Sequence, residues 1–254
     1  MPEGDTIHRI ARRIGVALSG RQLGLVEAPN PRSPLHARVT ELDGATLTES
    51  EAYGKHLLLH FDNALVVHSH LGMSGRWRVS ADGAAPLGKP WLLLASGRSV
   101  AHTSGGKILR LVSAARARND PALAQLGPDP LRPGFDEALA ARRILGWEPS
   151  ERVGAALNDQ SLIAGVGNVI RIEALWLSRV SPWRRIADLE PAEAEAIVKH
   201  TRWVMETAIA RGERPKQIYG KRARRPCPRC GGRIRSHGQG DDNRVTFWCE
   251  GCQR

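Results

Sequence analysis

The chain has 254 residues, of which 41% are hydrophobic, so it can form one large domain or two smaller ones with a real core. It has no run of 18 apolar residues and no basic stretch followed by an apolar one at its start. We therefore expect no transmembrane helix, no secretory signal, no membrane partner and a cytoplasmic location. The formal net charge of +11 and the pI of about 10.3 indicate a polyanionic partner, most simply nucleic acid.

The first residues are Met1-Pro2-Glu3-Gly4-Asp5. A small second residue usually allows removal of the initiator methionine, which would leave Pro2 with a free secondary amine. Such an amine, with a pKa near about 8, is partly unprotonated at neutral pH and can form an iminium with a sugar aldehyde carbon. Glu3 would place a proton-transferring carboxyl group beside it. The alternative is that Pro2 is an ordinary second residue.

Residues 5–18 are predicted to form a helix, because apolar residues recur on one face at spacings of three or four, at Ile7, Ile10, Ile14 and Leu18. Asp5 or Thr6 can cap its first turn. This helix would hold the N-terminus on a rigid element.

Short apolar or alternating segments follow between residues 22 and 112, separated by Gly, Asp, Asn and Pro, which is typical of a β-sandwich. The predicted strands are His56–Phe61, Leu65–His68, Gly75–Val79, Trp91–Ala95 and Ile108–Val112. Lys55 precedes a strand, where it could project toward a cleft or simply be a surface lysine. His70 and Met73 are expected in a Gly-rich turn, where Met73 could be ordinary packing or an apolar wedge inserted into a base stack.

Residues 119–135 are rich in Pro, Gly and Asp and indicate a hinge, after which helical periodicity dominates from 136 to 211. In the stretch 191–211, Pro191 lies near the expected start and Gly212 just after the end. We therefore expect an N-terminal domain over 1–118, a hinge over 119–135, a helical domain over 136–215 and a metal module over 222–254.

Within residues 152–176, helical segments flank Gly165-Val166-Gly167-Asn168. Asn168 can cap the next helix, whose first N–H groups form an anion site. The alternative is an ordinary helical corner. Residues 211–235 then carry ten basic residues against one acid, Glu213, which indicates phosphate contact rather than a solvated tail.

Cys227 and Cys230 form one C-x2-C pair, and Cys249 and Cys252 form a second, with eighteen residues between the pairs. The spacing predicts one structural Zn2+ held by four thiolates; two disulfides or a redox C-x-x-C are the alternatives. A metal-folded hairpin would present Arg244 near its tip as a phosphate probe, although Arg244 alone is an ordinary solvated turn residue.

The chain resembles the formamidopyrimidine-DNA glycosylase/endonuclease VIII (Fpg/Nei) family of bifunctional base-excision repair enzymes. The segments that carry the resemblance span the whole chain in the family's order: MPEG at 1–4, GKHLLLHF at 54–61, SHLGMSG at 69–75, LGPDPL at 126–131, DQSLIAGVGNVIRIEALW at 159–176, and CPRC with FWCEGCQR at the end. The endonuclease VIII branch, and actinobacterial versions in particular, look closest. The resemblance implies an α+β fold: an N-terminal β-sandwich with a leading helix, a hinge, and a helix–two-turns–helix domain followed by a zinc-finger β-hairpin.

The resemblance also implies roles for single residues. Pro2 would be the nucleophile at C1′ of the lesion's sugar, and Glu3 would be the acid/base that opens the sugar ring and assists elimination. Phosphates around the flipped nucleotide would be gripped by Lys55, His70, Asn168 and Arg244, with Lys55 nearest the chemistry. Met73 would fill the gap left in the stack, and Glu173 matches a family acid near the active site.

The sequence departs from the family pattern in three places. Thr6 stands where a second Glu is frequent, residues 104–116 lack an Arg-x-Phe insert, and only fifteen residues separate 191–211 from Cys227. Purine-directed members carry a longer base-capping loop there. We therefore expect a monomeric DNA glycosylase with β,δ-elimination lyase activity on oxidised pyrimidines in duplex, bubble or single-stranded DNA. The alternative is a non-catalytic zinc-ribbon protein that binds damaged or single-stranded nucleic acid.

Overall fold

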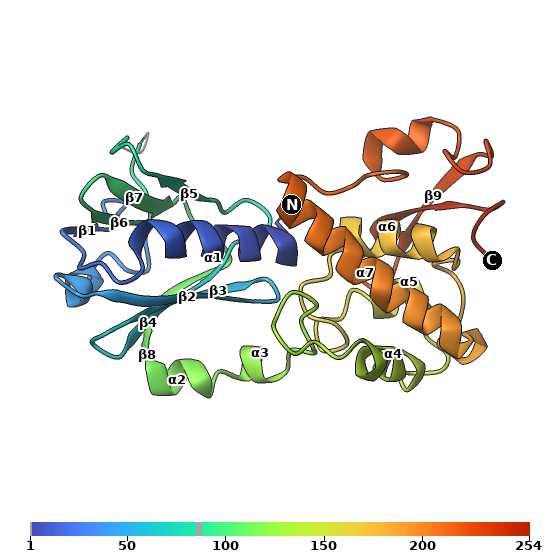
Figure 1. The fold of residues 1–254 in the computed structure, drawn as a ribbon, viewed down its shortest axis with the longest axis horizontal. Coiled ribbons are helices and arrows are strands. Elements are labelled where there is room, and N and C mark those ends of the chain that lie inside the picture. The colour runs from blue at the N-terminus through green and yellow to red at the C-terminus, as the bar shows by residue number, and fades with distance from the viewer. Residues whose placement is uncertain (1, 85–87) are drawn as a thin grey trace. The chain divides into compact units, whose positions relative to one another are not determined.

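The computed structural model describes residues 2–84 and 88–254, and the chain divides into two compact units, Met1–Ala124 and Gln125–Arg254 (Figure 1). Each unit has its own hydrophobic core. The finer domain limits that we expected from the sequence stay a prediction. Within the described residues, no helix is long and apolar enough to cross a bilayer.

The first unit is a β-sandwich of two four-stranded antiparallel sheets behind a leading helix, α1 (Gly4–Leu18), as predicted. One sheet has the order β1–β6–β7–β5 and the other the order β2–β3–β4–β8. The strands are β1 (Leu25–Glu27), β2 (Leu47–Tyr53), β3 (His56–Phe61), β4 (Leu65–His70), β5 (Trp77–Ser80), β6 (Leu92–Ser96), β7 (Ser99–Thr103) and β8 (Ile108–Ser113). A 3-10 turn, Val39–Leu42, and two short helices, α2 (Ala114–Arg118) and α3 (Pro121–Ala124), complete the unit.

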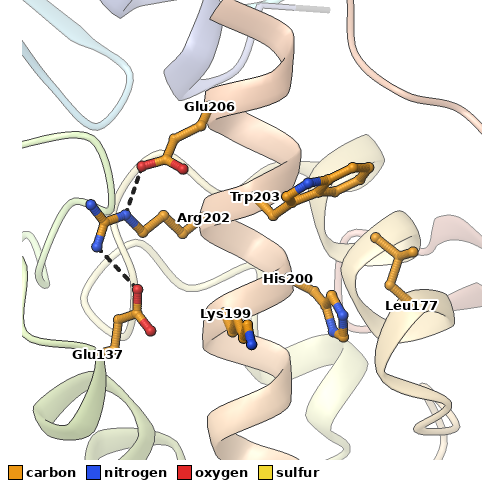
Figure 2. Close-up of a pocket in the computed structure, with 7 residues that line it drawn as sticks. All are labelled: Glu137, Leu177, Lys199, His200, Arg202, Trp203 and Glu206. Carbon is orange, nitrogen blue, oxygen red and sulfur yellow. Dashed lines mark hydrogen bonds and ion pairs between the residues drawn. The ribbon is translucent and has the colours of Figure 1, made fainter.

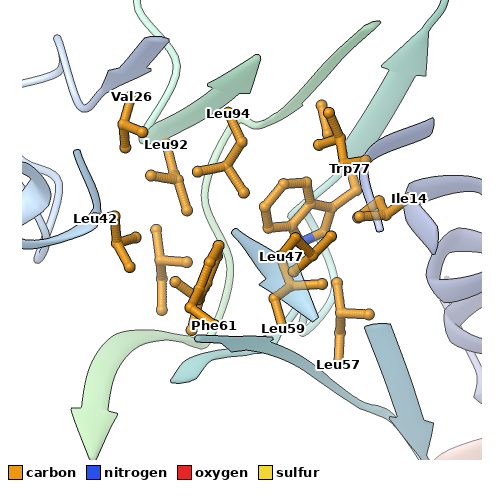
Figure 3. Close-up of a cluster of buried hydrophobic side chains, with 14 of the residues drawn as sticks. Ile14, Val26, Leu42, Leu47, Leu57, Leu59, Phe61, Trp77, Leu92 and Leu94 are labelled. Carbon is orange, nitrogen blue, oxygen red and sulfur yellow. The ribbon is translucent and has the colours of Figure 1, made fainter. Parts of the chain in front are cut away.

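Every second side chain of β3 fills the space between the two sheets. Leu57, Leu59 and Phe61 point inward and pack with Leu92 and Leu94 of β6 (Figure 3). The apolar stripe of α1 is buried against the same core, which fixes the start of the chain to the sandwich. A two-residue period in a strand and a stripe on a helix are the patterns that bury one face of each.

The start of α1 differs from the prediction. Asp5 and Thr6 lie inside the first turn, and the N-cap residue is Glu3, which makes no side-chain cap hydrogen bond. The carbonyl of Glu3 accepts the N–H groups of Thr6 and Ile7 at 3.0 and 3.3 Å, so the helix begins one residue earlier than its apolar stripe indicates.

The second unit contains four helices of the expected helical region and a C-terminal hairpin. The helices are α4 (Glu137–Leu145), α5 (Val153–Ala156), α6 (Asn168–Ser178) and α7 (Pro191–Arg211), and the hairpin strands are β9 (Ile234–Gln239) and β10 (Arg244–Cys249). Two further 3-10 turns cover Ile186–Asp188 and Gly220–Arg224. Helix α7 has Pro191 at its start and Gly212 at a φ of 78° after its end, as predicted. The α+β class is therefore confirmed.

Candidate active site

Pro2 and Glu3 immediately precede the anchored helix α1. Pro2 is partly buried, and Glu3 is buried in an extended conformation with a φ of −126°. Because α1 packs along the sandwich core, these two residues are held on a rigid support rather than on a free tail. The expected removal of Met1 concerns a residue outside the described part of the chain.

Lys55 lies at the tip of the β2–β3 hairpin. Tyr53 pairs with His56, so Gly54 and Lys55 form a two-residue loop. Gly54 has a φ of +56° and Lys55 does not have a positive φ, which is the pattern of a type II′ turn with glycine at its first central position. The tight turn gives the lysine a defined starting point at the end of the sheet.

His70 is the last residue of β4 rather than a turn residue, which corrects the prediction. It pairs in register with His56 on β3 and Ile108 on β8. Its Nδ1 accepts the N–H of Gly72 at 3.1 Å, so the imidazole carries its proton on Nε2 and offers that group as a donor. Burial, followed by the charges of Lys107 and Lys55, lowers the pKa of His70.

Met73 stands at the tip of the turn after β4 with 83% of its surface exposed. The backbone of this turn packs tightly against the loop 104–107. A Cβ on Gly75 would lie 2.6 Å from the carbonyl oxygen of Gly105, and a Cβ on Gly106 would lie 2.7 Å from the carbonyl oxygen of His70. Glycine is required at both positions for this approach. An exposed apolar tip on a rigid loop has the form that a wedge requires.

The same loop contact adds a residue that the sequence did not single out. The N–H of Lys107 donates to the carbonyl of His70 at 2.7 Å, and the Lys107 charge acts on the His70 ring. The structure therefore brings together three cationic or donor side chains of the first unit, Lys55, His70 and Lys107. No local motif marked Lys107, since its position depends on the β7–β8 connection of only four residues, 104–107.

Asn168 is the first residue of α6 rather than its cap, which corrects a second prediction. The N-cap residue is Gly167, and no side chain caps this end. The Asn168 amide instead donates to the carbonyl of Val245 on β10 at 2.9 Å. The side chain thus joins the start of α6 to the C-terminal hairpin.

Arg171 reinforces this junction from a fully buried position. Its Nε and Nη2 donate to Oδ1 of Asn168 at 3.0 and 2.7 Å, and its Nη1 donates to Gly154 and to Gln239 of β9, both at 2.7 Å. A Cβ on Gly154 would lie 2.4 Å from the Gln239 side chain, so the helix and the hairpin meet without a gap. Sequence reasoning missed Arg171, because its partners are far away in the chain.

Glu173 anchors a loop in the structure. Its carboxylate accepts the backbone N–H groups of Gln217, Ile218 and Tyr219 at 2.8, 3.1 and 2.9 Å. Burial raises the pKa of Glu173, and the three backbone hydrogen bonds oppose that rise. The carboxylate fixes the segment after α7, and its role as an active-site acid stays a prediction.

The four cysteines converge as one site. Their Sγ atoms all lie within 4.8 Å of one another, with 3.7 Å between those of Cys227 and Cys252 and 3.5 Å between those of Cys230 and Cys249. Tetrahedral zinc with Zn–S bonds of about 2.3 Å places sulfur atoms about 3.8 Å apart, so the cluster fits the ion. All four are free cysteines, which excludes the disulfide alternative in this structure. The arrangement is consistent with one structural zinc, as predicted.

Arg244 begins β10, next to the carbonyl that Asn168 binds, and is partly exposed. Its Nη2 and Nε donate to Oδ2 of Asp242 at 2.7 and 3.0 Å. Nearby in sequence, the basic segment lines a cavity of about 590 Å³ whose charged residues are Arg211, Glu213, Arg214, Lys216 and Arg222. The positive charge predicted from composition is thus concentrated at this part of the second unit.

Another cavity, of about 430 Å³, lies beside α7 and contains none of the predicted site residues. Figure 2 shows Arg202 in its wall, bridging Glu137 and Glu206 at 3.0 and 2.8 Å, with Trp203 nearby. Because it contains none of the residues predicted for the chemistry, neither Pro2 nor Glu3 among them, we do not assign the reaction to it.

Comparison with known proteins agrees with this geometry over the whole chain. The family profile "Formamidopyrimidine-DNA glycosylase N-terminal domain" matches residues 1–119, and "Formamidopyrimidine-DNA glycosylase H2TH domain" matches residues 126–219. "Probable endonuclease 8 2" of Streptomyces coelicolor is 35% identical over 100% of this chain and 94% of its own length. "Endonuclease 8 1" of Mycobacterium tuberculosis is 31% identical, with both chains fully covered. "DNA-(apurinic or apyrimidinic site) lyase Nei2" of Mycolicibacterium smegmatis is 34% identical over 100% of this chain and 99% of its own.

Solved structures share the fold. The Lactococcus lactis Fpg complex with abasic-site DNA superposes with a TM-score of 0.84 at 22% identity, covering 99% of both chains. The complex of the same organism's protein with DNA that contains an oxidized pyrimidine gives a TM-score of 0.85 at 23% identity, with full coverage of both chains.

Proposed function

The chain belongs to the formamidopyrimidine-DNA glycosylase/endonuclease VIII family of bifunctional DNA glycosylases and AP lyases of base excision repair, and we propose that it removes oxidised pyrimidines through an N-terminal proline Schiff base. The observation that carries the proposal is the placement of Pro2 and Glu3 directly before a helix whose apolar stripe is buried in the sandwich core. A nucleophile on a rigid element can hold the geometry that attack requires.

The chemistry follows from a secondary amine beside a carboxyl group. After removal of Met1, the unprotonated nitrogen of Pro2 forms a bond to C1′ as the glycosidic bond breaks; the base leaves with the bonding electrons and takes up the proton that the Pro2 nitrogen loses. Glu3 donates a proton to the ring oxygen, so the sugar opens and the C1′–N iminium forms. Loss of a C2′ proton then expels the 3′ phosphate, and a second elimination expels the 5′ phosphate. Hydrolysis of the iminium returns the free amine.

The remaining predicted residues would hold the DNA. Lys55 and His70, with Lys107 beside them, offer cationic and N–H donors for phosphate oxygens in the first unit. Arg244 and the start of α6 at Asn168 offer the same in the second unit. Cys227, Cys230, Cys249 and Cys252 would hold the zinc, which with four thiolates has no open position and stabilises the hairpin rather than reacting.

Two short connections support a preference for pyrimidine lesions. The four residues between β7 and β8 leave no room for a long insert opposite the lesion, and residues 212–226 include a stretch that Glu173 holds down. A pocket with fewer walls would favour small, non-planar bases such as thymine glycol, which also unstack at lower cost. With Met73 as the exposed wedge, the enzyme would also accept bubbles and single strands. We propose that it acts on DNA in the cytoplasm of a bacterial cell, as its relatives from bacteria suggest.

Single-turnover cleavage of matched duplexes tests this preference. We expect 5-hydroxyuracil to be removed faster than 8-oxoguanine, with little dependence on the opposite base. Faster removal of 8-oxoguanine, strictly opposite cytosine, would overturn the lesion assignment and leave the lyase chemistry to be judged separately.

A further inference from the structure

Four polar side chains of the first unit form a continuous line behind His70. Asp120 contacts Nη2 of Arg110, and Nη2 and Nε of Arg110 approach Nδ1 of His68 at 3.0 and 3.2 Å. Nε2 of His68 then lies 2.8 Å from Nδ1 of His56. Finally, the His56 ring meets the His70 ring edge-on, with centroids 4.8 Å apart. This line crosses one face of the sheet, because His56 pairs with His70 and His68 pairs with Arg110.

Arg110 fixes the direction of every hydrogen bond in the line. A guanidinium only donates, so Nδ1 of His68 must accept from Arg110 and the His68 proton must sit on Nε2. That proton is donated to Nδ1 of His56, so the His56 proton must sit on its own Nε2. The Asp120 carboxylate lies 3.5 Å from Nδ1 of His68, beyond a good hydrogen bond, and binds Arg110 instead.

His56 is thereby left with one N–H group that the line does not use. The residue is only 8% exposed, yet no hydrogen bond within the described residues involves its Nε2. Although it has no partner, Nε2 is not fully buried, so this edge of the ring remains accessible to solvent. Burial first, then the charges of neighbours that include Arg110 and Lys107, lower the pKa of His56 to about 3, so it is a neutral donor.

Its surroundings suit a negatively charged acceptor. His56 directly follows Lys55 in the chain, faces His70 across the β3–β4 ladder, and lies within the electrostatic reach of Lys107. A neutral N–H donor that is surrounded by positive charges would repel a cationic ligand and could not form a hydrogen bond with an apolar one. A phosphate oxygen, by contrast, accepts such a proton well.

We propose that His56 is a further DNA-phosphate-binding residue, whose Nε2–H is aimed by the buried line His68–Arg110–Asp120. The proposal rests on the proposed function, since it assigns the phosphates to a lesion-containing strand. His68, Arg110 and Asp120 are positioning residues, because they act through His56 and do not touch the DNA.

Binding of a duplex that carries a tetrahydrofuran abasic analogue tests the donor. We expect His56→Phe to weaken binding by about three- to tenfold, the range of a net hydrogen bond. His60→Phe is the matched control, since His60 lies on the same strand and contacts Glu51 instead; it should bind like the wild type. In duplexes with single methylphosphonates scanned around the lesion, one neutralised phosphate should abolish the His56→Phe effect.

A second pair of variants tests the aiming line. Gln at position 68 can accept from Arg110 and donate to His56, whereas Met can do neither, so His68→Gln should retain binding that His68→Met loses. Nitrogen NMR shifts of the wild type at pH 7 should show both rings protonated on Nε2, and Arg110→Met should give mixed tautomers.

These measurements distinguish a failure of the proposed function from a failure of the His56 proposal. If the wild type fails to bind the abasic duplex, the proposed function fails. If it binds and His56→Phe binds equally well, or the effect persists at every methylphosphonate position, the His56 proposal is wrong. Equal binding by His68→Gln and His68→Met, or Nδ1-protonated rings in the wild type, would overturn the positioning role.

Discussion

The side-chain amide of Asn168 donates to the carbonyl of Val245 at 2.9 Å, joining the first residue of α6 to the strand that begins with Arg244. Two groups proposed to bind phosphate, the α6 start and Arg244, therefore belong to one frame. Arg171, buried behind Asn168 and bonded to Gln239 of β9, holds the same frame from the other hairpin strand.

Removing the Asn168 side chain should loosen this frame. Asn168→Ala deletes the donor to Val245 and the acceptor of two Arg171 N–H groups, which leaves a buried guanidinium less satisfied. We expect the free energy of unfolding to fall by about 2–4 kcal/mol. Urea unfolding compared with Asn119→Ala, an exposed asparagine of the first unit whose side chain makes no hydrogen bond within the described residues, checks this. Equal losses in the two variants would refute the junction.

Loss of the metal should release the hairpin. Cys249→Ser removes one of the four thiolates of the cluster. The zinc content should therefore fall from one ion per chain to well below one. Elemental analysis measures the zinc, and limited proteolysis within residues 234–249 reports the order of the hairpin. Ser236→Ala on β9 is the control and should keep its zinc. Active protein without zinc would contradict the account.

In the structure Asp242 binds Arg244, the residue that we propose contacts a DNA phosphate, so the two acceptors should compete. Arg244→Ala should weaken DNA binding by about 1–3 kcal/mol, because a charged hydrogen-bond donor is lost. Asp242→Asn should tighten binding, since it removes the negative charge that Arg244 contacts at 2.7 Å and so weakens the competing contact. Asp241→Asn makes the same charge change beside it and serves as the control. Titrations at several salt concentrations decide, and identical affinities for the two Asn variants would count against the competition.

The buried histidines should make stability depend on pH. Burial first, then neighbouring charges that include Arg110, lower the pKa of His56 to about 3 and that of His68 to about 4, from 6.5. Between pH 6.5 and 4 the unfolded chain binds protons that the folded one does not, so stability falls as pH falls. The slope is at most about 1.4 kcal/mol per pH unit for each histidine.

His68→Gln removes one of these titrations and should flatten the curve relative to the wild type. Urea unfolding at pH 7 and pH 5 measures the difference, and His60→Gln is the control because the His60 side chain is partly exposed, contacts Glu51 and takes no part in the buried line. The same loss of stability in His68→Gln and the wild type would show that the ring is not buried neutral.

The elements whose formation depends mainly on neighbouring residues in the sequence were predicted correctly. The alternation of β3, the stripe of α1, the proline and glycine at the ends of α7 and the cysteine spacing each carry their own signal, and all were confirmed. Strand β2 was not predicted, because its sequence LTESEAY is mostly polar and its place depends on partners elsewhere in the chain, β3 and α1.

The candidate site was predicted less completely, because its details depend on distant partners. Asn168 was expected to cap a helix, yet its amide is used by a strand far along the chain. In the sequence, Arg110 and His68 look like ordinary strand residues. Only the β4–β8 register places them side by side. Lys107 reaches His70 only through a close contact between two glycine-containing loops.

The central claim is that the amine of Pro2 attacks the sugar. Borohydride reduction during the reaction with a 5-hydroxyuracil duplex, followed by peptide mass spectrometry, tests it most directly. The wild type without Met1 should be trapped on DNA through Pro2 alone, and protein that retains Met1 should neither be trapped nor cleave the strand. Trapping through a lysine, or full strand cleavage by protein with Met1 attached, would contradict the account.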